Sequence, residues 1–372
     1  MSSVIDTIVT RGRVVKSAQP KRILFYGACH ATIFRRVYEN FCTDESYSFD
    51  KITNFDIINR GIPFPYDQVS EWDIIVFSPI LRRAGYETVR LIDACIKNNV
   101  KYFSYPHLHW RGYFPYIKED YFVNMRTWHY PKSISLAGEY EDFATYLNEF
   151  SKPFKNVDEI LSNLESSTEA LRKNEILGEC NFKISDYVIE EYKNRRLFLI
   201  PGHPSQALYI EAIKRLNEHL NLPIDPSYFY SALEPQGGVK VPIHPDVSES
   251  LELKFHDADF QNNTSSFADR NISWTDYMRL SYGCGRGSTM WQANAGTSIK
   301  CALQPSNTLK DDECIRVSRG TILQARKLPT KDSSHWQLDI SWADPGLRRK
   351  LQNWDNVYIY KNHWQETVHP AK

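Results

Sequence analysis

The chain has 372 residues, of which 42% are hydrophobic and 13% aromatic, which suits two packed domains and argues against wholesale disorder. Lys plus Arg and Asp plus Glu number 45 each, so the net charge is near zero and gives no sign of a nucleic-acid partner. The first twenty residues lack the apolar segment of a signal peptide, and no run of 18 apolar residues occurs. We therefore expect a cytoplasmic protein without a membrane span.

The seven cysteines are scattered along the chain, and no pair has C-x-x-C spacing. This pattern predicts reduced thiols and no structural zinc or other metal site.

The first hundred residues alternate between strand and helix patterns. An apolar run over 21–27 ends at a glycine, and apolar residues at helical spacing follow it. The segments 73–79 and 100–106 predict two further strands, with a helix over 86–99 between them. This order predicts a three-layer α/β domain with a parallel sheet, in which ligand sites lie at the carboxyl ends of the strands. The residues at those ends are Gly27, Ser78 and Tyr105.

The rest of the chain falls into a helical part and a β-rich part. Helices are predicted over 135–150, 157–175, 184–196 and 205–220, and a short strand ends in "PGHPS" at 201–205. The segment 251–297, which contains "YGCGRGS", predicts a linker or loop insertion. From residue 298 short strands predict a small antiparallel barrel. We therefore expect an α/β domain over 1–290 and a β-domain over 298–372.

Cys29 and His203 are the candidate catalytic residues. Cys29 stands in "KRILFYGACHATIF", on the corner between a strand and a helix, where free amide groups and the helix dipole favour an anion. A thiolate there can attack an acyl carbon, or the amides can bind a phosphate or oxyanion. The alternative is a small buried thiol that fills the corner. His203 follows a later strand and is the type of base that partners a cysteine, although a loop histidine bonded to the backbone is the plainer interpretation.

Further polar residues follow the same predicted strands and are candidates for binding substrate or cofactor. Two adjacent arginines follow the second strand and suit a phosphate or carboxylate, and at most one is expected to contact a ligand. The aromatic loop 106–115 follows the third strand and can stack on a sugar or an adenine, or simply cover the core. The candidate binding residues are Gly27, His30, Arg82, Arg83, His107, Trp110, Arg111 and Ser205, the last of which can also cap the helix over 205–220.

The order of these motifs resembles the WcbI-type polysaccharide biosynthesis family over residues 20–285. The resemblance is carried by the first strand ending in Gly-x-Cys, by "DIIVFSPILRRAGY", "YPHLHWRGYFP", "LFLIPGHPSQAL" and "VKVPIHPDVSESLEL", in that order. The family's hallmark Gly-Asn-Cys-Gln reads Gly27-Ala28-Cys29-His30 here, so the Asn amide, a candidate oxyanion or substrate donor, is lost.

This resemblance implies a cytoplasmic enzyme of capsule or surface-glycan assembly. Its implied activity is transfer of an acyl (acetyl) group from coenzyme A, a small-molecule donor, to a sugar or glycan acceptor. By position it carries over Gly27, Cys29, His203 and Pro204, and less securely the loop 106–115.

The C-terminal segment 298–368 resembles the small SH3-like β-domains of cyanobacterial and phage cell-wall-related proteins. The "HW" dipeptides at 335 and 363 and the segment "VSRGTILQ" carry this likeness. An exposed tryptophan there can read a glycan, and a tryptophan packed in the core is the plainer interpretation.

Two other functions compete with acyl transfer. An SGNH-type ester hydrolase also has a nucleophile after the first strand and a late His-Pro, but here the nucleophile is a cysteine, and Ile200 stands where an Asp precedes the histidine. A non-catalytic glycan-binding protein is the third interpretation, because the hallmark is altered and a β-domain is attached.

Overall fold

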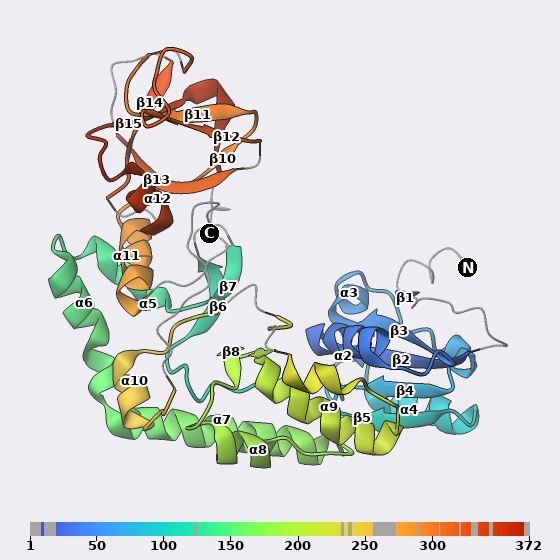
Figure 1. The fold of residues 1–372 in the computed structure, drawn as a ribbon. Coiled ribbons are helices and arrows are strands. Elements are labelled where there is room, and N and C mark those ends of the chain that lie inside the picture. The colour runs from blue at the N-terminus through green and yellow to red at the C-terminus, as the bar shows by residue number, and fades with distance from the viewer. Residues whose placement is uncertain are drawn as a thin grey trace. The chain divides into compact units, whose positions relative to one another are not determined.

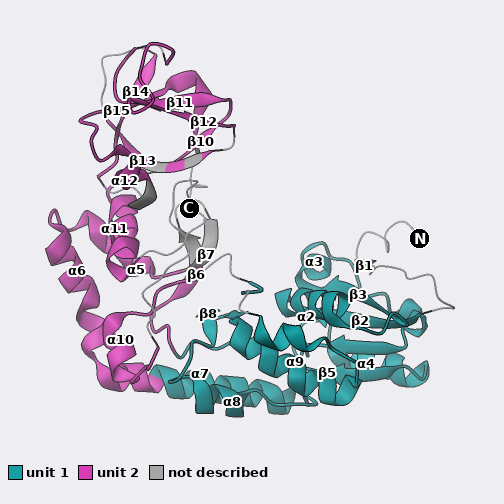
Figure 2. Cartoon of the chain, viewed as in Figure 1, with its two compact units in different colours: residues 1–112, 163–236 teal, residues 113–162, 237–372 magenta. Residues whose placement is uncertain are grey.

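The computed structural model describes residues 9–10, 20–122, 125–231, 234–236, 240–255, 273–287, 289–304, 306–319, 321–328, 334–341 and 345–367. These residues form two compact units (Figure 2). One comprises 1–112 and 163–236 and the other 113–162 and 237–372, so the boundary falls inside one long helix. No helix in the described ranges combines the length and the apolar character needed to cross a membrane.

The first unit is built on a sheet with the order β1-β3-β2-β4-β5, in which the last four strands are parallel. The strands are β1 Val9–Thr10, β2 Lys21–Gly27, β3 Tyr47–Thr53, β4 Ile74–Phe77 and β5 Lys101–Ser104. After β2 the chain first adds β3 on one side and then crosses to add β4 on the other. The carboxyl end of β2 is therefore the point at which the strand order reverses, where open α/β sheets bind ligands.

Helices cover both faces of this sheet (Figure 1). Leu24 and Tyr26 of β2 pack in a core with α3 (Asn54–Asn59), η1 (Tyr66–Glu71) and α4 (Thr88–Lys97). Phe25 points to the other face, where its ring stacks on Tyr38 of α2 (Cys29–Phe41) at 5.5 Å. On that face Phe34 of α2 also meets Tyr209 of α9 (Gln206–Leu220) at 6.0 Å. The predicted three-layer α/β arrangement is thus present, with β2 buried on both faces as parallel strands are.

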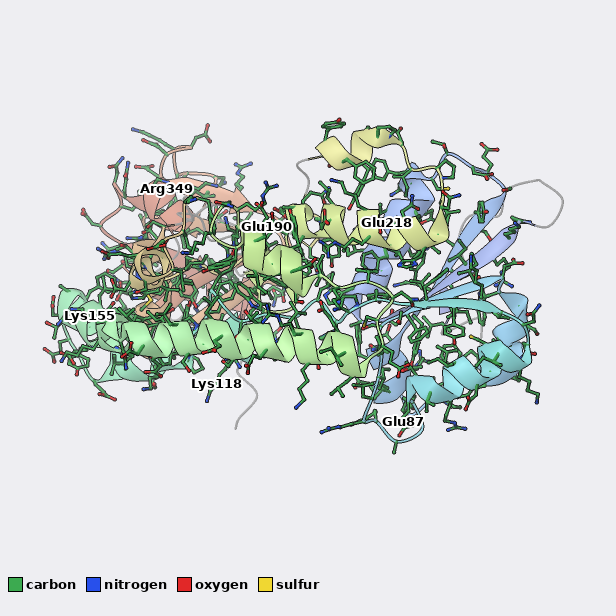
Figure 3. The ribbon with its side chains drawn as sticks, turned by 90° about the horizontal axis from the view of Figure 1, so that it is seen from below. Glu87, Lys118, Lys155, Glu190, Glu218 and Arg349 are labelled. Atoms are coloured by element: carbon green, nitrogen blue, oxygen red, sulfur yellow. The ribbon has the colours of Figure 1, made fainter. Side chains whose placement is uncertain are left out.

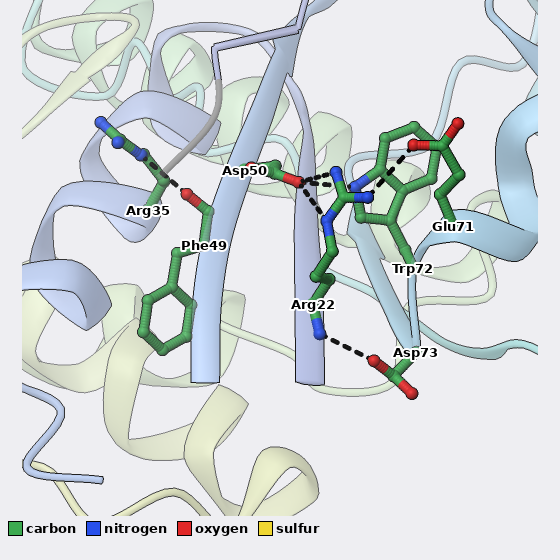
Figure 4. A network of polar contacts seen from close by, with 7 residues as sticks. All are labelled: Arg22, Arg35, Phe49, Asp50, Glu71, Trp72 and Asp73. Atoms are coloured by element: carbon green, nitrogen blue, oxygen red, sulfur yellow. Dashed lines mark hydrogen bonds and ion pairs between the residues drawn. The ribbon is translucent and has the colours of Figure 1, made fainter. Parts of the chain in front are cut away.

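A buried carboxylate interrupts the apolar pattern of β3 (Figure 4). The guanidinium of Arg22 donates to Asp50 Oδ2 at 3.1 and 2.6 Å, and the indole of Trp72 donates to the same oxygen at 2.9 Å. Arg22 also bonds Glu71 at 3.1 Å. Asp50 is only 3% exposed, and these donors offset the cost of removing its charge from water.

The remaining elements of residues 113–255 are mainly helical. Figure 3 marks two of these helices by Glu190 on α8 and Glu218 on α9. The bounds are β6 Lys118–Phe122, β7 Met125–His129, α5 Pro131–Ser135, η2 Leu136–Gly138, α6 Phe143–Ser151, η3 Lys152–Lys155, α7 Val157–Leu177, α8 Ser185–Glu191, β8 Phe198–Ile200, β9 His203–Pro204, η4 Pro226–Tyr230 and α10 Pro245–Ser250.

The C-terminal part of the second unit is a seven-stranded antiparallel sheet with the order β12-β11-β15-β14-β13-β10-β16. Its core gathers Trp291, Ile299, Leu338, Ile359 and Trp364, all nearly fully buried. The bounds are α11 Trp274–Gly285, β10 Thr289–Ala293, β11 Thr297–Lys300, β12 Cys314–Val317, β13 Ile322–Leu328, β14 His335–Asp339, α12 Pro345–Leu351, β15 Val357–Tyr360, η5 Lys361–His363 and β16 Trp364–Thr367.

Two predictions for this region need correction. The segment 251–297 is not simply a linker, because α11 and β10 lie within it, while residues 256–272 of that segment are outside the described ranges. Since β10 pairs with both β13 and β16, the sheet begins before residue 298. The tryptophans of the two "HW" dipeptides follow the plainer interpretation, since Trp364 is 2% exposed and the ring of Trp336 lies 4.8 Å from that of Trp291 in the core. The division into domains at 290–298 stays a prediction.

Candidate active site

Cys29 is the first residue of α2 and follows the central strand directly. Its N-cap, Ala28, has no side chain able to bond the free amides of the first turn. Cys29 is the one exposed residue among the seven cysteines, so the thiol is accessible to a ligand. Gly27 is required just before it, because a Cβ at position 27 would collide with the buried hydroxyl of Tyr105. The corner therefore presents a reachable sulfur beside a phenol.

The pKa of the Cys29 thiol differs in direction from the prediction. Partial burial raises the pKa, and a backbone N–H of the corner lowers it by less. Asp56 raises the pKa further, and Lys51 opposes this. The residue as a whole is exposed, but its thiol is partly desolvated. The expectation of a lowered thiol pKa was wrong, and at neutral pH the thiol keeps its proton.

His30 connects this corner to the loop that carries His203. Its ring is 1% exposed, and Nε2 lies 3.1 Å from the carbonyl oxygen of Gly202. Because a carbonyl accepts, Nε2 carries the proton and Nδ1 is the acceptor nitrogen. Nδ1 is buried and has no hydrogen-bond partner among the described residues. The contact from the β2–α2 corner to the His203 loop is thus made by His30.

Four histidines gather at this edge of the sheet, from three separate segments. The ring of His30 lies 5.3 Å from that of His107, which is parallel to the ring of His109 at 5.9 Å. His203 adds to the cluster electrostatically, since its charge would lower the pKa of His30. Burial lowers the pKa of His30, His107 and His203, and burial together with His107 and Arg111 lowers that of His109 to about 4. All four imidazoles are neutral at pH 7, and the lowered pKa values make them weaker bases than a free imidazole.

A cleft of about 370 Å³ opens at the ends of β4 and β5, within the first unit. Its lining combines two cationic side chains with an imidazole, an amide and apolar groups: Pro79, Leu81, Arg82, His107, Lys173, Asn174 and Leu177. His107 belongs to both the cleft and the histidine cluster, so the two features adjoin.

The end of α7 is fixed against this cleft by close packing and hydrogen bonds. A Cβ at Gly178 would lie 2.8 Å from Cγ of Pro79, so a glycine lets the helix end approach the β4 loop. Asn181 Oδ1 accepts from the backbone N–H of Ser104, at the end of β5, at 2.7 Å. Lys173 and Asn174 are therefore carried on a firmly attached helix.

The remaining candidate residues lie in different settings. Arg83 is exposed and outside the lining of the cleft. Trp110 is 1% exposed and donates to Thr168 Oγ1 at 3.2 Å, which places it in the core and does not support ligand stacking. Arg111 is half-buried, and its carbonyl accepts from Asn163 at 2.9 Å.

Ser205 occupies the N-cap position of α9, as predicted, but its hydroxyl does not cap the helix. It donates to the carbonyl of Arg196 at 2.8 Å instead. The first free amide of the helix, that of Gln206, is bonded by Glu234 at 2.6 Å. Ser205 thus holds the β8–β9 turn and is 3% exposed.

Lys173 and Asn174 were not predicted, because they lie on a polar helix about seventy residues beyond the third predicted strand. Tyr105 was predicted at the end of its strand, but the environment of its hydroxyl was not predicted. This oxygen is buried without a hydrogen-bond partner among the described residues, and burial together with Cys29 raises its pKa. Across the described ranges, no group of three His, Cys, Asp or Glu is arranged to hold a metal ion.

Comparisons with known proteins bear on the fold and the family of the chain. No curated protein matches the chain. A solved structure of WcbI, described as a novel polysaccharide biosynthesis enzyme in its native form without a disulfide bond between coenzyme A and a cysteine, aligns with a TM-score of 0.55 at 17% identity. The alignment covers 72% of this chain and 90% of that one, and at such identity it speaks for the fold. The family model for the polysaccharide biosynthesis enzyme WcbI matches residues 22–225, more than half of the chain. The chain therefore belongs to the WcbI family of polysaccharide biosynthesis enzymes.

Proposed function

We propose that the protein transfers an acyl group, in the first instance acetyl, from coenzyme A to a hydroxyl of a sugar or polysaccharide precursor. The observation that carries this proposal is the accessible thiol of Cys29 beside a cluster of neutral histidines, in the same unit as a cationic cleft. The solved WcbI structure, whose description mentions coenzyme A and a cysteine, supports the choice of donor.

The residues of the cleft fit the chemistry of coenzyme A. Its phosphates require cations, which Arg82 and Lys173 supply as charge-assisted donors. The apolar side chains of Pro79, Leu81 and Leu177 suit the adenine or the pantetheine chain. When bound, acetyl-coenzyme A supplies an activated thioester, and the protein's residues orient it and accept or donate the protons.

We assign Cys29 as the nucleophile and His203 as its base. Because the thiol is protonated at pH 7, a base must take its proton before the sulfur can attack. His203 is neutral at that pH, and its Nδ1 has no hydrogen-bond partner among the described residues, so it has the capacity to accept. In this step a sulfur–carbon bond forms to Cys29 and the thiol of coenzyme A leaves with a proton. The acceptor hydroxyl then attacks the acyl carbon and gives its proton to His203, the bond between the acyl carbon and the Cys29 sulfur breaks, and the proton passes to Cys29 to restore its thiol.

The test is to incubate the protein with acetyl-coenzyme A and measure its intact mass. We expect the mass to rise by one acetyl group that peptide mapping assigns to Cys29. Cys29→Ala should remove this adduct and still bind coenzyme A in calorimetry, whereas Cys42→Ala, the matched control at the opposite end of the same helix, should behave as the wild type.

Two results would contradict the proposal. Coenzyme A that fails to bind the wild type would remove the donor. An unmodified Cys29 in a protein that still releases coenzyme A would remove the nucleophile and return Cys29 to a binding role.

A further inference from the structure

The C-terminal sheet carries a second cavity, of about 550 Å³, which is unrelated to the residues of the acyl-transfer proposal. This volume falls in the range of small-molecule sites, about 300–1,000 Å³. Most of its lining residues carry a polar group, among them Thr297, Ser298, Lys300, Arg316, Tyr360 and His363. We call it the β11–β12 pocket.

Strand alternation aims cationic side chains into this pocket. Ile299 and Ile359 point into the core of the sheet and are fully buried, and Ile315 packs against them. Their chain neighbours therefore point to the opposite face. On that face Ser298 and Arg316 stand directly opposite each other across β11 and β12, and Lys300 follows two residues along. The two cations thus share one face of one strand pair.

Lys300 is nearly enclosed, and its side chain makes one hydrogen bond within the described residues. It is 7% exposed, and its Nζ donates to the carbonyl of Gln304 at 2.9 Å. An ammonium has three donors, and within the described part of the chain no carboxylate pairs with Lys300 or Arg316. The nearby carboxylate of Glu313 instead accepts from the backbone N–H of Lys310 at 2.9 Å. A buried cation without a counter-charge is costly, and an anionic ligand would remove that cost.

The rest of the lining suits a hydroxylated ring. Tyr360 supplies an aromatic ring, which lies 4.7 Å from the ring of His363 in an edge-to-face arrangement. His363 Nδ1 in turn lies 3.1 Å from the hydroxyl of Thr297. Aromatic rings pack on the apolar faces of sugars, while hydroxyl and imidazole groups bond their hydroxyls.

We propose that the β11–β12 pocket binds an anionic saccharide unit, one that carries a carboxylate or a phosphate. Arg316 and Lys300 bind the charged group, and Tyr360, His363 and Ser298 contact the ring and its hydroxyls. This goes beyond the acyl-transfer proposal, since it adds a saccharide-binding site on the C-terminal sheet and stands whether or not Cys29 is a nucleophile.

Calorimetric titration of the full-length protein tests this with three probes: a glucuronate-containing disaccharide, glucose 1-phosphate and maltose. We expect at least one anionic probe to bind and maltose not to bind, and the stronger anion identifies the carboxylate or the phosphate as the recognised group. Arg316→Gln should lower the affinity for the anionic probe by about tenfold or more, because a charge-assisted contact is lost. Arg319→Gln, an exposed arginine in the next turn outside the lining, is the matched control and should bind as the wild type.

Lys300→Gln is the second variant, checked for folding by its circular-dichroism melt because the residue is buried. It should lose affinity in the same direction as Arg316→Gln. Failure of both anionic probes to bind, equal binding of maltose, or an equal loss in Arg319→Gln would overturn the proposal. Coenzyme A titrated into the same samples reports on the first unit separately, so the two proposals can fail independently.

Discussion

Arg82 and Arg83 are adjacent in the chain and chemically identical, yet the structure separates them by position. Arg82 lines the cleft at the end of β4, and Arg83 lies outside that lining in an exposed turn. We therefore expect Arg82→Ala to lower the affinity for coenzyme A by about tenfold in calorimetry. The reason is that a charge-assisted contact with a phosphate is worth about 1.5–3 kcal/mol. Arg83→Ala changes the same charge of the protein and should leave the affinity within about twofold. Equal losses in both variants would mean that only the general positive field matters.

At the scale of elements, the close approach of β2 and the residue after β5 makes a specific prediction. A methyl group on Gly27 would collide with the hydroxyl of Tyr105, while the ring carbon that bears this hydroxyl would be 3.3 Å away. Gly27→Ala should cost roughly 1–3 kcal/mol of unfolding free energy, as other overpacked sites do. Tyr105→Phe removes the oxygen, so the double variant should recover most of the loss in denaturant titrations. Additive losses would show that the collision is relieved elsewhere.

The elements also show which parts of the fold the sequence could predict and which it could not. Strands β2, β4 and β5 were predicted because their apolar residues are consecutive, as burial on both faces requires. Strand β3 was missed because Asp50 and Lys51 interrupt its pattern, and the partners that allow Asp50 to be buried, Arg22 and Trp72, come from distant segments. Helix α11 was missed because the glycines at its end are typical of a loop.

The candidate site divides in the same way. The corner at Cys29 and the loop at His203 follow from strand ends, which local patterns reveal. The link through His30, the contribution of Lys173 and the orphaned hydroxyl of Tyr105 depend on contacts between segments far apart in the chain. Such contacts leave no periodic signal in a single sequence.

At the scale of the whole molecule, stability should fall as the pH falls below the ordinary imidazole range. Burial lowers the pKa of His244 to about 3, and its ring stacks on Phe154 at 3.9 Å. Above the unfolded pKa both states are neutral, and below it the unfolded chain binds the proton first. Each histidine of this kind therefore costs up to about 1.4 kcal/mol per pH unit between about pH 6.5 and its folded pKa.

His244→Asn tests this dependence. Asparagine can keep the N-cap acceptor that His244 Nδ1 provides to Asp246 at 3.1 Å, but it does not titrate. The variant should lose less melting temperature than the wild type between pH 7.5 and pH 5, whatever the cost of the lost stacking at pH 7.5. An unchanged slope would show that His244 is already protonated or accessible in the native state.

The domain division is tested by ending the chain at Gly287. This keeps the bond from the Tyr282 hydroxyl of α11 to the carbonyl of Tyr140 at 2.8 Å. It removes the seven-stranded sheet and α12, whose Arg348 pairs with Asp276 of α11 at 3.0 Å. We expect a folded, monodisperse fragment that binds coenzyme A as the full chain does. Aggregation, or loss of that binding, would mean that the sheet completes a core shared with the rest of the chain.

The C-terminal sheet begins and ends on neighbouring strands, since β10 pairs with β16 from Met290 opposite Thr367 to Ala293 opposite Trp364. Its point of entry and its point of exit are therefore side by side. A module with this property tolerates circular permutation, in which the old ends are joined by a short linker and new ends are opened in an exposed turn. It can equally be inserted into a surface loop of another protein, because its adjacent ends do not force the two sides of that loop apart. The sheet is therefore suited to transfer between proteins as a whole domain.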